Sequence, residues 1–200
     1  NFKDFDDIWR IHEIDGKIIF QTYESFFIYD DGRLQVVKPR TRFHFSFHVN
    51  GRLLLHEPGL GIYEYLNDKL VFLSWSEELK DKEINEILYS DEENLLICTG
   101  GNGIYQLEEG KIFRWQSQVN NLIENYRLFS AHKVEEGYIA FGTILNGLIV
   151  SDFNGKIIQH INTDNGLQNN TVLSLFSGQG GNLWLGLDNG IDYIELNSPI

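Results

Sequence analysis

The 200-residue sequence contains one cysteine, three prolines and no methionine. Because Cys98 is alone, no disulfide can form within the chain, and the paired-cysteine spacing of zinc sites is missing. No apolar run approaches the roughly 20 residues that a membrane-spanning helix needs, and no secretory signal peptide opens the sequence. Since not even the first residue is a methionine, we interpret the chain as a processed or excised portion of a longer protein.

Basic residues are also scarce. The sequence has 16 Lys and Arg against 29 Asp and Glu, which gives a formal net charge of −13 at pH 7. Phosphate contacts need clustered Lys and Arg, so this charge disfavours nucleic-acid binding, and it disfavours direct contact with an anionic membrane. The 42% hydrophobic and 22% charged residues are ordinary for a globular chain and argue against disorder.

One short apolar segment recurs five times along the chain, at intervals of 35, 42, 44 and 44 residues. Each copy holds apolar and β-branched residues after a turn, which is the pattern of a short strand. The copies are GKIIFQT from Gly16, GRLLLHE from Gly51, ENLLICT from Glu93, GYIAFGT from Gly137 and GNLWLGL from Gly181.

Each copy is preceded by one further strand candidate and followed by a hairpin. The hairpin turns DDGR, LNDK, EEGK and FNGK contain the residues that tolerate positive φ. Four short strands in a repeat of roughly forty residues are typical of a β-propeller blade. We therefore predict an all-β fold of about five four-stranded antiparallel blades, forming either a closed five-bladed ring or a partial propeller.

The repeat places the blades at about 1–39, 40–75, 76–117, 118–163 and 164–200, all within one propeller domain. The segment SEELKDKEINEIL, Ser76 to Leu88, departs from the pattern, and we expect one or two helical turns there at most. The last repeat stops after its third strand.

The last repeat, Asn162 to Leu196, resembles the two-component regulator propeller repeat. That pattern runs GL-x-x-N-x-V, then a strand, then GN-L-W-x-G-T, then a glycine-containing turn and another strand. Leu187 stands where the pattern has Thr. The resemblance is partial from GYIAFGT to Gly147 and extends to the first three repeats by period only. The matching residues are Gly166, Leu167, Asn170, Val172, Gly181, Asn182, Leu183, Trp184, Gly186 and Gly190.

Proteins with these repeats are extracytoplasmic sensor regions of hybrid histidine kinases or related regulators in Gram-negative bacteria. Their propellers precede a small β-sandwich domain, a membrane span and a cytoplasmic output module. The resemblance implies a periplasmic location, as the extracytoplasmic part of a membrane-anchored protein, and dimerisation through the adjacent domain. It also implies a small polar ligand such as a glycan-derived oligosaccharide. The parent protein would be a histidine kinase, whereas we expect no enzymatic activity in these residues.

The residues themselves provide no catalytic or metal pattern. His44 and His48 alternate with phenylalanines as on a strand, where four residues span ~13 Å, too far for one zinc ion. Gly100 to Gly103 lacks the Lys-Ser/Thr continuation of a phosphate loop. The acidic segment Asp91 to Glu93 lacks the alternating ligands of a calcium loop. No GxSxG motif occurs, so we predict no catalytic residue, metal or cofactor.

Polar residues in the turns are the candidate ligand groups. In a propeller, the turns between second and third strands share one face of the disk with the connections between blades. Amide and carboxylate groups suit a hydroxyl-rich ligand, although the same residues are also common turn formers. We expect Trp184 to pack between blades. The candidates are Glu57, Asn102, Asn146, Asp188 and Asn189 in the turns, and Asn169 and Asn170 in a connection.

The predicted function is a non-catalytic ligand-sensing propeller of a bacterial two-component signalling protein. Two other functions stay open at this point, because propellers host many unrelated activities. One is a protein–protein interaction scaffold. The other is an enzyme on a propeller scaffold, such as a lyase or a glycosidase, which would need clustered acids or a metal on one face.

Overall fold

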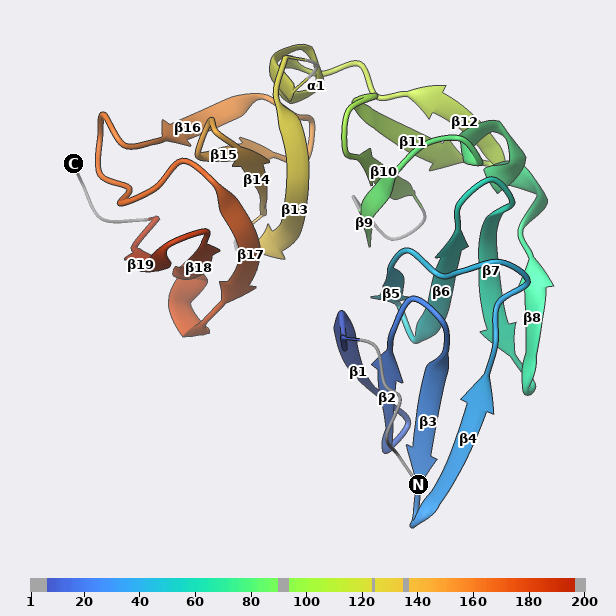
Figure 1. The fold of residues 1–200 in the computed structure, drawn as a ribbon. Coiled ribbons are helices and arrows are strands. Elements are labelled where there is room, and N and C mark those ends of the chain that lie inside the picture. The colour runs from blue at the N-terminus through green and yellow to red at the C-terminus, as the bar shows by residue number, and fades with distance from the viewer. Residues whose placement is uncertain (1–6, 90–93, 124, 135–136, 197–200) are drawn as a thin grey trace. The chain divides into compact units, whose positions relative to one another are not determined.

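The computed structural model describes residues 7–89, 94–123, 125–134 and 137–196. The described residues form five antiparallel sheets, each a meander in which consecutive strands pair (Figure 1). Four of the sheets have four strands, and the fifth has three. The predicted all-β architecture of propeller blades is confirmed.

The sheets follow one another along the chain. The first sheet contains β1 (Arg10–Ile14), β2 (Lys17–Gln21), β3 (Phe26–Asp30) and β4 (Arg33–Val37), and the second contains β5 (Ser46–Val49), β6 (Arg52–Glu57), β7 (Gly61–Leu66) and β8 (Lys69–Phe72). The third contains β9 (Ile84–Tyr89), β10 (Leu95–Thr99), β11 (Ile104–Glu108) and β12 (Lys111–Arg114). The fourth contains β13 (Arg127–Val134), β14 (Tyr138–Ile144), β15 (Leu148–Asp152) and β16 (Ile157–Ile161). The fifth contains β17 (Val172–Ser177), β18 (Leu183–Leu187) and β19 (Gly190–Ile194), with a short 3₁₀ segment, Gln179–Gly181, between its first two strands.

Two further helical segments connect sheets. A 3₁₀ helix, Ser74–Leu79, precedes β9, so the expected short helix is confirmed in the first part of the predicted segment only. The second part of the segment is instead strand β9, which buries Ile84 and Ile87. The helix α1, Gln118–Ile123, was not predicted. Its sequence signal is Ser117, whose hydroxyl accepts a hydrogen bond from the Asn120 backbone N–H at 3.0 Å, as a helix N-cap does.

The hairpin turns have the backbone conformation that their residues predict. Asp31 and Gly32 have φ values of 43° and 79°, and Glu109 and Gly110 have 49° and 77°. Two consecutive residues with positive φ are required by the hairpin turn whose twist matches the flanking strands. The turns therefore explain why these positions are occupied mainly by Gly, Asn and Asp.

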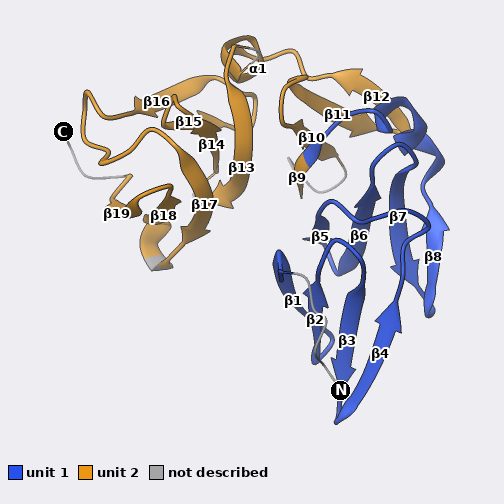
Figure 2. Ribbon diagram, viewed as in Figure 1, with its two compact units in different colours: residues 1–84 blue, residues 85–200 orange. Residues whose placement is uncertain are grey.

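The chain divides into two compact units, residues 1–84 and 85–200 (Figure 2). In the first unit, a core cluster that includes Phe26 and Leu55 joins the first two sheets. In the second unit, one cluster joins the third and fourth sheets and another joins the fourth and fifth. The neighbouring residues Ile149 and Val150 belong to different clusters, so both faces of the fourth sheet are buried. The assignment of all 200 residues to one domain stays a prediction.

The glycine of the repeated segment is required by close packing. In the fourth sheet, Gly142 on β14 pairs with Ser130 on β13, next to a shift in the pairing register of β13. In the fifth sheet, Gly186 on β18 pairs with Ser174 on β17, next to an equivalent register shift. A Cβ atom added at Gly142 would lie 2.8 Å from the backbone oxygen of Val172 in the fifth sheet. A glycine therefore lets the fourth and fifth sheets approach each other at this point.

We predict that Gly142→Ala lowers the free energy of unfolding by about 1–3 kcal/mol, because the added methyl group must displace backbone. Gly101→Ala is the matched control, since a Cβ there meets no atom within 4 Å. It should change the free energy by less than about 0.5 kcal/mol in the same urea titration. Equal effects of the two substitutions would contradict this explanation.

Two histidines of the first unit are held neutral by burial. His56 on β6 is 1% exposed, and neither of its ring nitrogens has a hydrogen-bond partner among the described residues. Burial lowers the pKa of His56 to about 3, with a smaller contribution from nearby His44. His12 on β1 lies 2.8 Å from the Ser46 hydroxyl (Nε2 to Oγ), and burial followed by Arg10 lowers its pKa to about 4.

These pKa values predict that acid destabilises the protein. Between pH 6.5 and about 4, the unfolded histidines bind protons that the folded ones do not, so the free energy of unfolding falls as the pH falls. His56→Leu removes one such group and should reduce the loss between pH 7 and pH 5 by about 1–2 kcal/mol. Phe113→Leu, at an exposed position, should keep the wild-type pH dependence. Unchanged pH dependence in His56→Leu, measured by urea unfolding, would refute the assignment.

Candidate functional site

Two turns and a connection of the second unit lie against each other and form what we call the turn face, residues 145–147, 162–171 and 188–189. The Gly147 backbone N–H donates to the Asn170 carbonyl at 2.7 Å, and the Asp188 N–H donates to the Thr171 carbonyl at 3.1 Å. The connection between β16 and β17 is therefore held between the β14–β15 turn and the β18–β19 turn. Five of the seven predicted ligand residues lie on this face.

A threonine at the end of the repeated segment closes the turn that follows it. The Thr143 hydroxyl donates to the Gly147 carbonyl at 2.9 Å and accepts from the Asn146 backbone N–H at 3.2 Å. In the third sheet, the Thr99 hydroxyl donates to the Gly103 carbonyl at 2.6 Å in the same way. Leu187 replaces this threonine in the fifth sheet. The β18–β19 turn therefore lacks this closing hydroxyl.

The asparagines of the connection organise the loop itself. The Asn170 side-chain oxygen accepts from the Thr163 backbone N–H at 2.8 Å, and its amide nitrogen donates to the Thr163 hydroxyl at 3.1 Å. The Asn169 side-chain oxygen accepts from the Thr171 N–H at 2.7 Å. These are the local bonds by which asparagine stabilises turns. Both side chains thus have a structural role whether or not a ligand is present.

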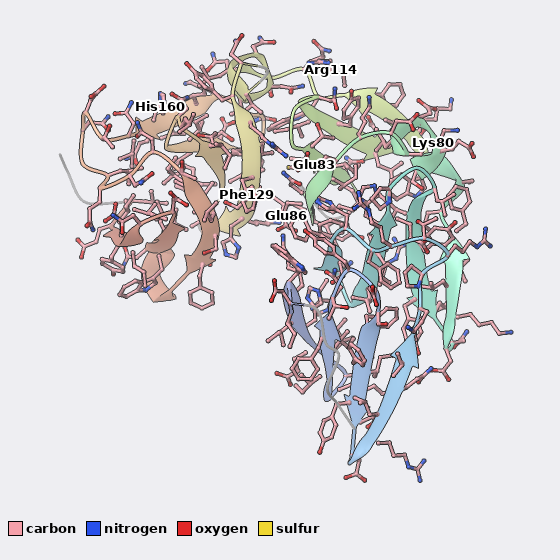
Figure 3. All side chains as sticks on the ribbon, in the orientation of Figure 1. Lys80, Glu83, Glu86, Arg114, Phe129 and His160 are labelled. Carbon is pink, nitrogen blue, oxygen red and sulfur yellow. The ribbon has the colours of Figure 1, made fainter. Side chains whose placement is uncertain are left out.

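Asn146 is more enclosed than the sequence suggested. Its backbone oxygen lies 2.9 Å from Nε2 of His160, which comes from β16 (Figure 3). Its side-chain nitrogen is buried and has no hydrogen-bond partner among the described residues. Asp188 and Asn189 are exposed instead. Of the five predicted ligand residues on the turn face, the exposed ones are therefore the two of the β18–β19 turn.

The other two predicted residues do not belong to the turn face. Asn102 is exposed in the β10–β11 turn, where its backbone N–H donates to the Thr99 hydroxyl at 3.0 Å. Glu57 belongs to the first unit and is fully buried. Its carboxylate accepts from the backbone N–H groups of Arg40 and Thr41 at 3.0 and 3.3 Å, so it holds the connection between β4 and β5. A ligand-binding role for any of the seven residues stays a prediction.

Trp184 does not pack between sheets, contrary to the expectation. Its side chain is 48% exposed and lies beside Tyr193, with ring centroids 4.8 Å apart. The same position of the repeated segment is Ile19, Leu96 or Ala140 in the first, third and fourth sheets, and each of these is buried. Those residues are covered by the next sheet along the chain, and the described residues contain no sheet after the fifth.

A groove of about 680 Å³ lies beside the fifth sheet and was missed by the sequence reasoning. It is lined by residues 159–161 of β16, residues 165–167 of the connection and residues 192–195 at β19. Its lining residues come from three separate segments, so no single motif in the sequence marks the groove.

The turn face offers hydrogen-bonding groups. Among the described residues, no three His, Cys, Asp or Glu side chains are grouped as they would be around a metal ion. Cys98 is fully buried, and burial raises the pKa of its thiol well above the usual value, which disfavours the reactive thiolate.

Within the described ranges, no helix has the length and apolar character to span a membrane.

No protein-family model and no curated protein matches the sequence. Solved structures do match the fold. The extracellular domain assigned to the one-component system BT4673 from B. thetaiotaomicron has a TM-score of 0.75 and 20% identity, and the match covers 99% of this chain and 29% of that one. The extracellular domain assigned to the hybrid two-component system BT3049 from the same organism has a TM-score of 0.76 and 17% identity, over 94% of this chain and 28% of that one.

A third match is the WD40 β-propeller domain of Doa1, with a TM-score of 0.68 and 14% identity over 90% of this chain and 60% of that one. All three likenesses show the propeller fold. The chain spans less than a third of the length of the two sensor-domain structures.

The turn face has asparagines that hold the loop and an exposed asparagine, and their effects on the free energy of unfolding should differ. Asn170→Ala should lower the free energy of unfolding by about 1–2 kcal/mol, because two hydrogen bonds to Thr163 are lost. Asn189→Ala, at an exposed position of the same face, should change it by less than about 0.5 kcal/mol. Urea unfolding of both variants measures the difference, and a larger effect of Asn189→Ala would contradict the assigned roles.

Proposed function

We propose that this chain is a non-catalytic, ligand-sensing propeller of a bacterial signal-transduction protein of the one- or two-component class. The observation that carries the proposal is the likeness of the fold over 99% of the chain to the extracellular domain assigned to BT4673. The resemblance of Asn162 to Leu196 to the two-component regulator propeller repeat supports it independently, because it rests on sequence rather than on shape. Fold alone does not determine function, so the proposal depends on both.

The ligand we infer is a small polar molecule, such as a glycan-derived oligosaccharide, bound at the turn face. Asp188 and Asn189 are exposed there, and a carboxylate next to an amide can both accept and donate hydrogen bonds to hydroxyl groups. The net charge of −13 favours a neutral or cationic ligand over an anionic one.

The comparison supports a location for the chain, and the resemblance of the last repeat to the two-component regulator propeller repeat implies its partners. The sensor structures that the chain resembles are extracellular domains, which supports an extracytoplasmic, periplasmic position for this chain. In that setting, ligand binding would be passed on through an adjacent domain that dimerises, and a histidine kinase or related output module of the parent protein would lie on the other side of the membrane.

Calorimetry with a panel of neutral oligosaccharides tests the function, using the full chain and the double variant Asp188→Ala, Asn189→Ala. We expect saturable binding of at least one oligosaccharide by the wild type and at least about tenfold weaker binding by the double variant, because a lost polar contact costs about 1.4 kcal/mol or more. Glu78→Ala, an exposed substitution in the first unit, should bind like the wild type.

Absence of binding to every oligosaccharide in the panel would overturn the proposed ligand class. Wild-type affinity in the double variant would overturn the turn face as the site, while leaving the sensing function in place.

A further inference from the structure

A pocket of the first unit is formed entirely by residues 40–80, in the interior of the sequence. It has a volume of about 480 Å³, which is within the range of small-molecule sites. Part of its wall is aromatic, because Tyr63 on β7 and Phe72 on β8 lie beside each other with ring centroids 5.4 Å apart. The other lining residues are Arg40 of the β4–β5 connection, Gly59 and Leu60 of the β6–β7 turn, and Glu77 and Lys80 at the 3₁₀ helix.

The backbone on both sides of this pocket is held by hydrogen bonds. On one side, the buried Glu57 carboxylate accepts from the Arg40 backbone N–H at 3.0 Å. On the other side, the Lys80 carbonyl accepts from the Gly59 N–H at 2.8 Å, and the Ser76 hydroxyl accepts from a backbone N–H of β7 at 2.8 Å. The segments that carry the two basic residues are therefore fixed before a ligand arrives, which lowers the entropic cost of binding.

Basic side chains gather at this pocket although the whole chain is acidic. Three of the five residues from Lys38 to Arg42 are Lys or Arg, and all three are exposed. The guanidinium carbon of Arg40 lies 5.8 Å from the centroid of the Tyr63 ring, so this cation lies against the aromatic wall. Lys80 adds a second positive charge. Two cations at one pocket favour a carboxylate, which accepts charge-assisted hydrogen bonds from both.

The acidic residue of the pocket is held only weakly. The Glu77 carboxylate lies 3.3 Å from the Lys80 ammonium group, and the two side chains are 63% and 42% exposed. An ion pair this exposed contributes little to stability. A ligand carboxylate can therefore replace Glu77 at Lys80, and Glu77 then becomes an acceptor for hydroxyl groups. This combination favours an acid that carries hydroxyl groups over a purely apolar acid.

From this arrangement we propose that the pocket binds an acidic sugar by its carboxylate. The carboxylate lies between Arg40 and Lys80, and the apolar face of the sugar ring packs on Phe72, which is 38% exposed. Ring hydroxyl groups bond to Glu77 and to the backbone of the β6–β7 turn. The site belongs to the first unit and the turn face belongs to the second, so it does not depend on the neutral ligand proposed for the turn face.

Calorimetry of the 200-residue chain with digalacturonate and with galactobiose of the same linkage tests the role of charge. The two disaccharides have the same rings, but each carboxylate of the first is a hydroxymethyl group in the second. We expect saturable binding of digalacturonate and at least about tenfold weaker binding of galactobiose, because the neutral sugar makes no charge-assisted hydrogen bonds. Sodium sulfate should also bind at least about tenfold more weakly, because it has no ring to pack on Phe72.

Two substitutions with opposite effects test the residues. Arg40→Gln keeps the backbone N–H that Glu57 holds, and it should weaken digalacturonate binding at least about fivefold. Glu77→Gln should strengthen binding about two- to fivefold, because it removes the carboxylate that competes for Lys80. A folding defect would not strengthen binding. Arg33→Gln, which removes the same charge as Arg40→Gln at an exposed position outside the pocket, should bind like the wild type.

The double variant Asp188→Ala, Asn189→Ala separates this site from the turn face. It should bind digalacturonate with the affinity of the wild type, even if the neutral oligosaccharides no longer bind it. A loss of digalacturonate binding in this variant would assign the acidic sugar to the turn face and overturn the proposal.

Three other results would also overturn it. They are absence of digalacturonate binding, equal affinity for galactobiose or for sulfate, and wild-type affinity in Arg40→Gln.

Discussion

Within each of the two units, burial of one sheet against the next sheet along the chain is the interaction on which the rest of the structure depends. A strand such as β15 sends Ile149 into one core cluster and Val150 into another, so the fourth sheet is apolar on both faces. A single sheet of this kind cannot cover its own faces, whereas a series of sheets can. The stability of every sheet is therefore tied to its neighbours, and the positions that limit their approach are restricted in sequence.

This constraint gives a physical reason for the residues that recur in the repeat. Gly142 is small because the neighbouring sheet approaches its backbone. Thr143, the next residue, directs its hydroxyl back to the turn, so that the turn stays compact where the connection to the next sheet crosses it. The polar turn face thus arises from the packing of the sheets. Of the predicted ligand residues on this face, only Asp188 and Asn189 are exposed and available for recognition.

The same constraint makes the fifth sheet different from the others. Trp184 and Tyr193 lie on a face of the kind that is covered in the preceding sheets, yet both side chains are about half exposed. Among the residues that the structure describes, the fifth sheet likewise has three strands where the other sheets have four.

The five-sheet fold, the strand order within each sheet and the hairpin turns could all be predicted from the sequence. They rest on local patterns, namely alternation of apolar residues, turn residues with positive φ and a period of about forty residues. The candidate site could be predicted only as a set of turn residues.

The tertiary structure decided which of those residues are exposed and which are engaged by other parts of the chain. It buried Glu57 against the backbone of Arg40 and Thr41, which lie 17 and 16 residues away. It also engaged Asn170 with Thr163 while leaving Asn189 exposed. It also left both ring nitrogens of His56 buried without a partner and opened the groove beside β19. Such features depend on which segments distant in sequence come to lie side by side, and no local pattern of residues carries that information.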